Sequence, residues 1–117
     1  MSDTPIEANN RQRNFFNKLR EGGSVWTLQS DGGYANFQEE ESTVIPVWVD
    51  EEDARNCTQE HFKDYQPQSI PVDVFWEEIV PLLIQNEVWM AINPTSDLCG
   101  NQVSAAEFEE LFLLEEA

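Results

Sequence analysis

The sequence is poor in cysteine, histidine and positive charge. Its 117 residues include two cysteines, one histidine and six lysines and arginines against 23 aspartates and glutamates, which gives a formal net charge of −17. One histidine and two cysteines leave little material for the common catalytic triads or for a structural zinc site. The negative charge disfavours direct binding to nucleic acid, because the phosphate backbone is bound by lysine and arginine.

Long hydrophobic runs are also missing. The longest apolar stretches are Ile79–Ile84 and Val88–Ile92, far short of the roughly 20 residues that a membrane-spanning helix needs. The first ten residues carry acids and no base, unlike the positively charged start of a secretory signal. We therefore expect a cytoplasmic protein without membrane contact, in which Cys57 and Cys99 are free, mostly buried thiols.

The chain does contain enough apolar material for a core. Hydrophobic residues make up 40% and aromatic residues 11% of the sequence, which is too much for a disordered protein in spite of the charge. The length is that of one domain, and we find no linker and no internal repeat. A single domain over residues 1–117 is expected.

The N-terminal segment is predicted to be helical. Thr4 and Glu7 have the spacing of a capping box, in which each side chain bonds to the backbone of the other. Gly22 can end the helix, because glycine adopts the left-handed conformation without steric strain. The helix is expected over residues 5–21.

The C-terminal segment repeats this logic. Ser104 and Glu107 form a second capping box, which predicts a helix over residues 105–115. Leu114 is expected to extend its buried face, with Leu113 pointing away.

Two further helices are predicted in the middle of the chain. Asp50 can cap a short acidic helix over residues 51–57, where negative charge suits the first turn. Asp73 can cap a helix over residues 74–85. Pro81 lies inside it and should kink it, because proline lacks the backbone donor.

The remaining apolar segments predict strands. Asp31-Gly32-Gly33 is a turn signal for a hairpin, and Pro46 predicts an edge position or a bulge. The predicted strands cover about residues 24–29, 34–38, 43–49 and 88–92, with residues 61–68 irregular and residues 69–72 a candidate short strand. Together the elements predict an α+β domain, in which a small, mostly antiparallel sheet of about four to five strands is packed by N-terminal, middle and C-terminal helices.

Four groups of residues occur in a recognisable order. They are Val25-Trp26-Thr27-Leu28 with Asp31-Gly32-Gly33, Ile45-Pro46-Val47-Trp48, Tyr65-Gln66-Pro67-Gln68-Ser69-Ile70, and Asp73-Val74-Phe75 with Pro81-Leu82-Leu83. Over about residues 15–112 they resemble a bacterial family known as domain of unknown function 2750. The resemblance implies a small cytoplasmic protein and carries over no catalytic residue. Through Ile92-Asn93-Pro94 and the order of elements, the chain also has a remoter likeness to the N-terminal domain of SseB-type secretion-enhancer proteins.

Motifs for catalysis, nucleotide binding and metal binding are not found in the sequence. His61 is the only histidine, and the glycine pairs lack the lysine and spacing of a phosphate-binding loop. If the acidic helix continued, Cys57 and His61 would lie one turn apart, and Cys99 could approach them from the turn before the last helix. No second ligand pair completes a zinc site. We expect no enzyme activity, no cofactor and no metal.

Charge is divided unevenly along the chain. Residues 1–20 hold four of the six bases, Arg11, Arg13, Lys18 and Arg20, so residues 21–117 hold two bases and 21 acids. We expect these four bases to pair with the acidic rim of the domain when the first helix docks. The alternative is a dipolar surface that steers a charged partner.

The acidity itself allows three interpretations: solvation alone, binding of a basic partner protein, or mimicry of nucleic-acid phosphates to inhibit a DNA- or RNA-binding protein. Clustering of the acids favours an interaction surface over even solvation. Trp76 follows Phe75, and because neighbours in a helix point apart, one of the two is expected to form an apolar contact patch. The residues expected to bind the partner are Glu39, Glu40, Glu41, Asp50, Glu51, Glu52, Asp53 and Trp76.

The function expected from the sequence is therefore a non-catalytic protein-interaction module with a basic protein partner. The alternatives are an acidic nucleic-acid mimic and a small enzyme with an unrecognised carboxylate site.

Overall fold

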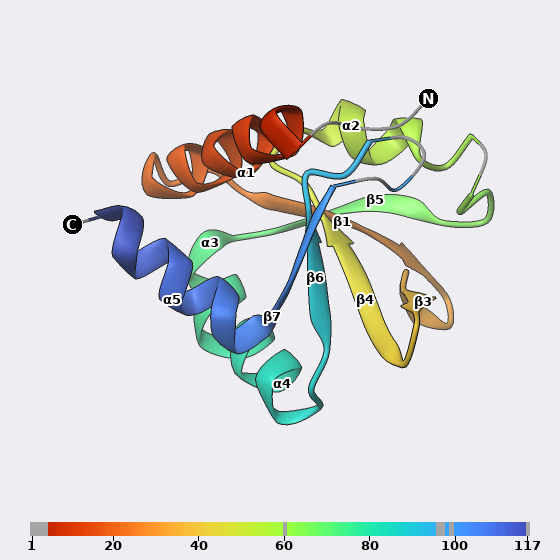
Figure 1. The fold of residues 1–117 in the computed structure, drawn as a ribbon. Helices are drawn as coiled ribbons and strands as arrows, with labels where there is room; N and C mark the ends of the chain where they lie inside the picture. Colours follow the sequence, from red (N-terminus) through yellow and green to blue (C-terminus); the bar gives the residue numbers. More distant parts are fainter. Residues whose placement is uncertain (1–4, 60, 96–97, 99, 117) are drawn as a thin grey trace.

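The computed structural model describes residues 5–59, 61–95, 98 and 100–116, and it shows two small sheets with helices on both sides (Figure 1). The elements, in chain order, are α1 (Pro5–Arg20), β1 (Val25–Ser30), β2 (Gly33–Tyr34), β3 (Phe37–Glu39), β4 (Ser42–Val47), α2 (Glu51–Asn56), β5 (Gln66–Ile70), α3 (Val72–Val74), the π-helical turn η1 (Phe75–Ile79), α4 (Val80–Gln85), β6 (Trp89–Ile92), β7 (Asn101–Ser104) and α5 (Ala105–Glu116).

One sheet has the strand order β2-β1-β5 and the other β3-β4-β6-β7. Hydrogen bonds between the backbones of Trp26 and Trp48, at 2.7 and 2.8 Å, join the two. Among the described strands, β4 and β6 pair in parallel and the other pairs are antiparallel. The predicted α+β class is confirmed, but the expected single sheet is replaced by two.

The first helix agrees with its predicted bounds. Its apolar stripe, Ala8, Phe15, Phe16 and Leu19, is buried against the core, as the 3.6-residue period requires. The helix ends before Gly22, whose φ of +82° is the left-handed conformation expected of a helix stop. Thr4, the predicted cap, lies outside the described residues.

The predicted hairpin strand over residues 34–38 is split between the two sheets. Tyr34 pairs with Gln29 of β1, whereas Phe37 pairs with Val44 of β4. Ala35 lies between them and is buried without exposed surface. The sequence could not indicate this change of partner, because both halves have the same local pattern.

Pro46 lies in an internal strand, not at the edge of its sheet. β3 ends opposite Val44, so only β6 runs beside Pro46 as a ladder partner. On the other side the Thr27 hydroxyl donates to the Pro46 carbonyl at 2.8 Å. Proline is thus tolerated because the strand is locally open on one side.

One strand, β5, was predicted only in part, and another, β7, was not predicted. β5 begins at Gln66, within the stretch expected to be irregular, and pairs with β1 from Val25 to Gln29. β7 pairs with β6 at the edge of the larger sheet. Both segments are mostly polar, so their strand conformation depends on tertiary pairing.

The middle helix is interrupted before Pro81, close to where a kink was predicted. The irregularity is a π-helical turn, η1, between α3 and α4. The helix begins earlier than predicted, at Val72, and Asp73 accepts a hydrogen bond from the adjacent Val74 amide instead of capping it. Asp50 similarly occupies the position before α2 without a side-chain capping bond.

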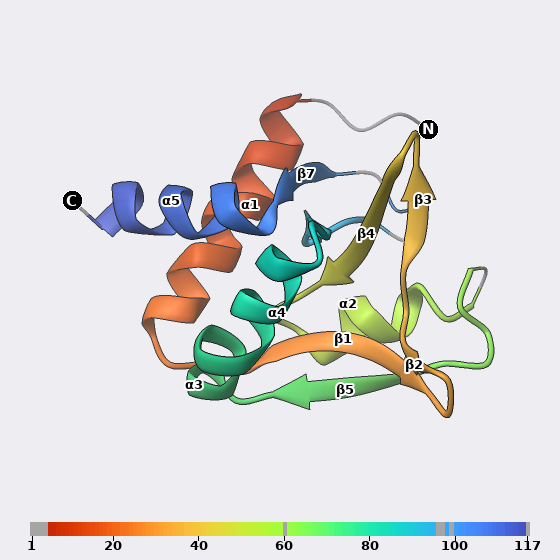
Figure 2. The same cartoon turned by 90° about the horizontal axis from the view of Figure 1, so that it is seen from below.

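The core has two parts on opposite sides of the sheets. The larger lies beneath α1, the middle helix and α5, and the smaller lies beneath α2. Two adjacent residues at the end of β4 show the division, because Val47, the last residue of the strand, contributes to the larger cluster and Trp48, directly after it, to the smaller one. Figure 2, turned by 90°, shows α5 crossing α1 on the side away from α2.

The C-terminal helix starts as predicted but buries less of its end. The Glu107 amide donates to the Ser104 hydroxyl at 3.1 Å, which confirms Ser104 as the cap. Leu114 is 71% exposed and Leu113 is 58% exposed. The predicted burial of Leu114 is therefore wrong, because the helix extends past the part of α1 on which it packs.

No helix in the described part of the chain has the length and apolar character needed to cross a lipid bilayer.

Candidate functional site

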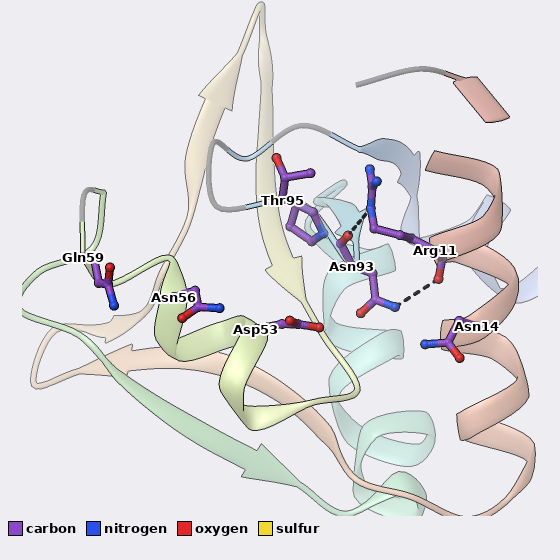
Figure 3. Close-up of a pocket in the computed structure, with 8 residues that line it drawn as sticks. Arg11, Asn14, Asp53, Asn56, Gln59, Asn93 and Thr95 are labelled. Carbon is purple, nitrogen blue, oxygen red and sulfur yellow. Dashed lines mark hydrogen bonds between the residues drawn. The ribbon is translucent and has the colours of Figure 1, made fainter. Parts of the chain in front are cut away.

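A polar pocket lies where the parallel strands β4 and β6 end. β4 leads into α2, β6 leads into the turn Asn93–Thr95, and α1 lies opposite α2 (Figure 3). In sheets with parallel strands, the carboxyl ends of the strands are the usual place for ligand sites. The pocket has a volume of about 370 Å³, within the range of small-molecule sites. The side chains around it are those of Arg11, Asn14, Asp53, Asn56, Gln59, Asn93, Pro94 and Thr95.

Asn93 forms the rigid centre of this region. Its backbone amide donates to the Val47 carbonyl at 2.8 Å and continues the pairing of β6 with β4. Its side-chain oxygen accepts from the Val49 amide at 3.2 Å, and its side-chain nitrogen donates to the Arg11 carbonyl at 3.0 Å. Its φ of +46° lies in the left-handed region, which asparagine tolerates better than most residues. One buried side chain thus ties α1 and the segment that leads into α2 to the end of β6.

The turn after Asn93 is held from the side of α2. Trp48 donates its indole N–H to the Pro94 carbonyl at 2.9 Å, and the buried Cys57 thiol donates to the Thr95 carbonyl at 3.4 Å. Buried donors that are satisfied in this way fix the backbone they contact. The base of the pocket is therefore preorganised.

The walls, in contrast, carry polar side chains without partners. Within the described residues, the side chains of Asn14, Asp53, Asn56 and Gln59 make no hydrogen bond and no ion pair. Figure 3 shows Asp53 between Asn56 on α2 and Asn14 on α1. The four side chains together offer one carboxylate and three carboxamides to an occupant.

Arg11 contributes to the scaffold of the pocket. Its Nε donates to the Asn93 carbonyl at 2.8 Å, and its guanidinium extends beyond Asn93, away from Asp53 (Figure 3). An arginine held by its Nε in this way is positioned by the backbone of Asn93 and contributes rigidity where α1 meets the turn.

Asp53 lies in an environment that disfavours its charge. Partial burial raises its pKa above the ordinary value of 3.8, and the neighbouring carboxylates of Asp50 and Glu52 raise it further. Within the described residues, no cation pairs with any of the three. The local potential of this wall is therefore negative, and it favours a positively charged occupant.

The predicted acidic residues fall into two separate groups. Glu39, Glu40 and Glu41 lie at the tip of the β3–β4 hairpin, and the run Asp50–Asp53 lies at the other end of β4. The six residues of β4 place the groups about 20 Å apart, at roughly 3.3 Å a residue. In both groups only Glu51 has an ion-pair partner, Arg55, within the described residues. All seven carboxylates are on exposed residues.

Trp76 does not form an isolated contact patch. Phe75 is fully buried and Trp76 is half-buried, with its ring 4.8 Å from the Phe112 ring and 5.5 Å from the Phe108 ring, between centroids. The π-helical turn allows both neighbours to face α5. The expectation that one of the two would be exposed is corrected, because each packs in the aromatic cluster.

For two of the four bases of α1, the predicted pairing with the acidic rim is wrong. Within the described residues, Arg13 and Lys18 make no ion pair with an acidic side chain. Arg20 donates to Asn17 and lies over the Phe112 ring, with its guanidinium carbon 5.3 Å from the centroid. Helix α1 docks through its apolar stripe, and Arg13 and Lys18 do not hold it in place.

The residues considered for a metal site are separated by burial. Cys57 is buried and bonded to Thr95, whereas His61 is exposed, and Cys99 lies outside the described residues. No group of three or more histidine, cysteine or acidic side chains in the described part of the chain is arranged to hold a metal ion.

Sequence reasoning identified Asp53 from its acidic run but missed the carboxamides beside it. Asparagine and glutamine have no distinctive motif, and Asn14, Asn56 and Asn93 come from three distant segments. One signal for the site was available in the sequence: Asn93 directly follows the apolar run of β6, and a polar residue at the end of a parallel strand is well placed to contribute to a ligand site.

Comparison with curated proteins found no match, and neither did comparison with solved structures. The likeness to the SseB-type domain therefore has no support from these comparisons. Residues 12–112 match the model of the family described as "Protein of unknown function (DUF2750)". This match covers most of the chain and agrees with the resemblance seen in its sequence. The chain belongs to this DUF2750 family.

Proposed function

We propose that this chain is a non-catalytic interaction module that binds a basic protein partner. The observation that supports the proposal is the uncompensated charge of the two acidic groups. Six of their seven carboxylates, all but that of Glu51, have no ion-pair partner within the described residues. Carboxylates that stabilise a fold are paired or hydrogen-bonded, so these six add repulsion to the folded state.

Such charge acts at long range before any contact forms. At physiological ionic strength the Debye length is about 8 Å, so each acidic group attracts a basic surface independently of the other, about 20 Å away. Complementary charge raises association rates and selects partners. A basic partner that reaches both ends of β4 would neutralise the hairpin tip and the start of α2 together.

The test begins with affinity purification of the tagged chain from cells of the organism that encodes it, with washes at low and at moderate salt. A basic protein retained at low salt and released at moderate salt is then purified, and its affinity for the chain is measured directly at several ionic strengths. If the tagged chain retains no basic protein, or if the affinity does not change with salt, the proposal is wrong.

Charge-neutralising variants locate the interaction. We expect two triple variants to weaken the complex by about tenfold or more each, because rim charges contribute to encounter and affinity. The first carries Glu39→Gln, Glu40→Gln and Glu41→Gln. The second carries Asp50→Asn, Glu51→Gln and Glu52→Gln. The matched control removes three charges from α5, at Glu107, Glu109 and Glu110, and should have a smaller effect. Equal losses from all three variants would indicate nonspecific attraction.

Competition by DNA tests the mimicry alternative. If the captured partner binds nucleic acid and DNA displaces the chain from it, the chain occupies the nucleic-acid site of that partner. The absence of acidic residues between Ser42 and Val47 argues against a continuous row of carboxylates along this face.

A further inference from the structure

We propose that the pocket between α1 and α2 binds the guanidinium group of an arginine side chain. The proposal rests on the function proposed above and identifies the chemical group of the basic partner that the chain binds. The four partnerless side chains of the pocket walls and its preorganised base carry the inference.

The chemistry of the walls favours a cation with several N–H donors. Asp53 supplies a carboxylate, and Asn14, Asn56 and Gln59 each supply a carbonyl oxygen from opposite sides of the pocket. A guanidinium has five N–H donors in a planar fork and no acceptor, so it uses several acceptors at once. An ammonium group has three donors on a single nitrogen atom, so it satisfies fewer of the acceptors in the pocket walls.

The negative charge beside Asp53 disfavours an anionic ligand. Asp53 has Asp50 and Glu52 close enough to raise its pKa. The guanidinium of Arg11, which also lines the pocket, keeps its positive charge but extends away from Asp53 (Figure 3). An anion beside α2 would be repelled by Asp53 and by its two acidic neighbours, whereas a guanidinium would relieve the repulsion among the three.

The shape of the pocket also suits a side chain that enters from outside. Its volume of about 370 Å³ accommodates a guanidinium with its methylene stem, and Pro94 offers an apolar surface on which the stem can rest. Because Asn93, Trp48 and Cys57 hold the base in place, little ordering is needed when the ligand binds.

The test uses the full chain and a defined probe, Nα-acetyl-arginine amide, titrated into ¹⁵N-labelled protein and followed by NMR. The expected result is saturable shifts of the side-chain amide signals of Asn14, Asn56 and Gln59. Nα-acetyl-citrulline amide has nearly the same shape without the charge and should bind about tenfold more weakly or not at all, because charged hydrogen bonds are about twice as strong as neutral ones. Nα-acetyl-lysine amide should bind less tightly than the arginine probe.

Two variants and one control test the residues. Asp53→Asn should weaken binding of the arginine probe by about tenfold, and Asn56→Ala should weaken it less. Asp64→Asn removes the same charge from an exposed loop residue outside this pocket and should leave the affinity unchanged. Thermal unfolding of all three confirms that they are folded.

The outcomes separate this proposal from the one on which it rests. Shifts spread over the hairpin tip, equal binding of the citrulline probe, or equal losses in Asp53→Asn and Asp64→Asn would overturn the pocket assignment. If the basic partner binds wild-type chain and Asp53→Asn equally well, the interaction function stands and the pocket assignment is wrong. If the arginine probe binds as expected but no basic protein is retained, the interaction function fails and the occupant is a free guanidino compound, not a protein side chain.

Discussion

At the scale of single residues, Asn93 does the most to hold the candidate site together. Replacing it with alanine removes two side-chain hydrogen bonds and takes from the Val49 amide the acceptor that it has in the structure. We expect Asn93→Ala to lower the free energy of unfolding by about 1–3 kcal/mol, which is the usual cost of leaving a buried group unsatisfied. Chemical denaturation measures this loss.

The backbone strain at this position can be separated from the hydrogen bonds. Asn93→Gly loses the same two bonds but accepts the positive φ without penalty, so it should be about 1 kcal/mol more stable than Asn93→Ala. Equal stability of the two variants would mean that the positive φ contributes nothing to the cost.

Asp53 is expected to destabilise the fold at neutral pH. Its pKa is raised in the folded state, so the folded protein takes up this proton at a higher pH than the unfolded chain does. The unfavourable contribution is therefore complete above the raised pKa and disappears as pH falls towards 3.8. We expect Asp53→Asn to melt at a higher temperature than wild type at pH 7, with the difference vanishing in acid.

Because many carboxylates titrate over the same range, Asp64→Asn serves as the reference for this comparison. Asp64 is exposed on a loop, and its replacement should change the melting temperature less than Asp53→Asn does at pH 7. A lower melting temperature for Asp53→Asn at pH 7 would contradict this prediction, because it would show that Asp53 stabilises the fold. Binding residues often reduce stability in exchange for function, and Asp53 would then not be an example.

Trp76 shows how packing decides the role of an aromatic residue. Its ring contacts those of Phe75, Phe108 and Phe112, so we expect Trp76→Ala to cost about 3 kcal/mol in the free energy of unfolding. A loss below about 0.5 kcal/mol would mean that Trp76 contributes little to the core and acts as a surface residue, as the sequence first suggested. Denaturant titration decides between the two.

At the scale of elements, the π-helical turn sets the register of the middle helix. A regular helix starting from Phe75 would bury residues at spacings of four and seven, Ile79 and Leu82. The structure buries Val80 and Leu83, buries Ile79 only in part and leaves Leu82 54% exposed. The extra residue in the turn η1 shifts every later side chain by one position.

This register yields a matched pair of variants. Leu83 is 6% exposed, so Leu83→Ala should cost about 2–4 kcal/mol. Leu82→Ala should stay within about 0.5 kcal/mol of wild type. A regular α-helix through Pro81 predicts the reverse order, so the comparison of the two variants by denaturant titration tests the turn itself.

The elements also show what a sequence can predict and why. Helices α1 and α5 and strands β1, β4 and β6 carry local signals, which are capping residues, glycine stops and apolar periodicity. β5 and β7 carry few such signals, because their backbone groups are satisfied by distant strands.

The residues of the candidate site also differ in whether a local signal marks them. Asp53 was recognisable within an acidic run, whereas the carboxamides of Asn14 and Asn56 gain meaning only when α1 and α2 are brought together.

At the scale of the whole molecule, the net charge of −17 should make stability depend strongly on ionic strength. Repulsion among exposed carboxylates destabilises the compact state, and salt screens it as the Debye length falls from about 30 Å at 0.01 M to about 10 Å at 0.1 M. We expect the melting temperature to rise with sodium chloride over this range and then to level off. The variant with Glu39, Glu40 and Glu41 replaced by glutamine has a net charge of −14. Since repulsion grows with the square of the net charge, its rise should be about two thirds of the wild-type value. An unchanged rise would mean that the hairpin tip does not share in the repulsion, and that its three charges act only on a partner.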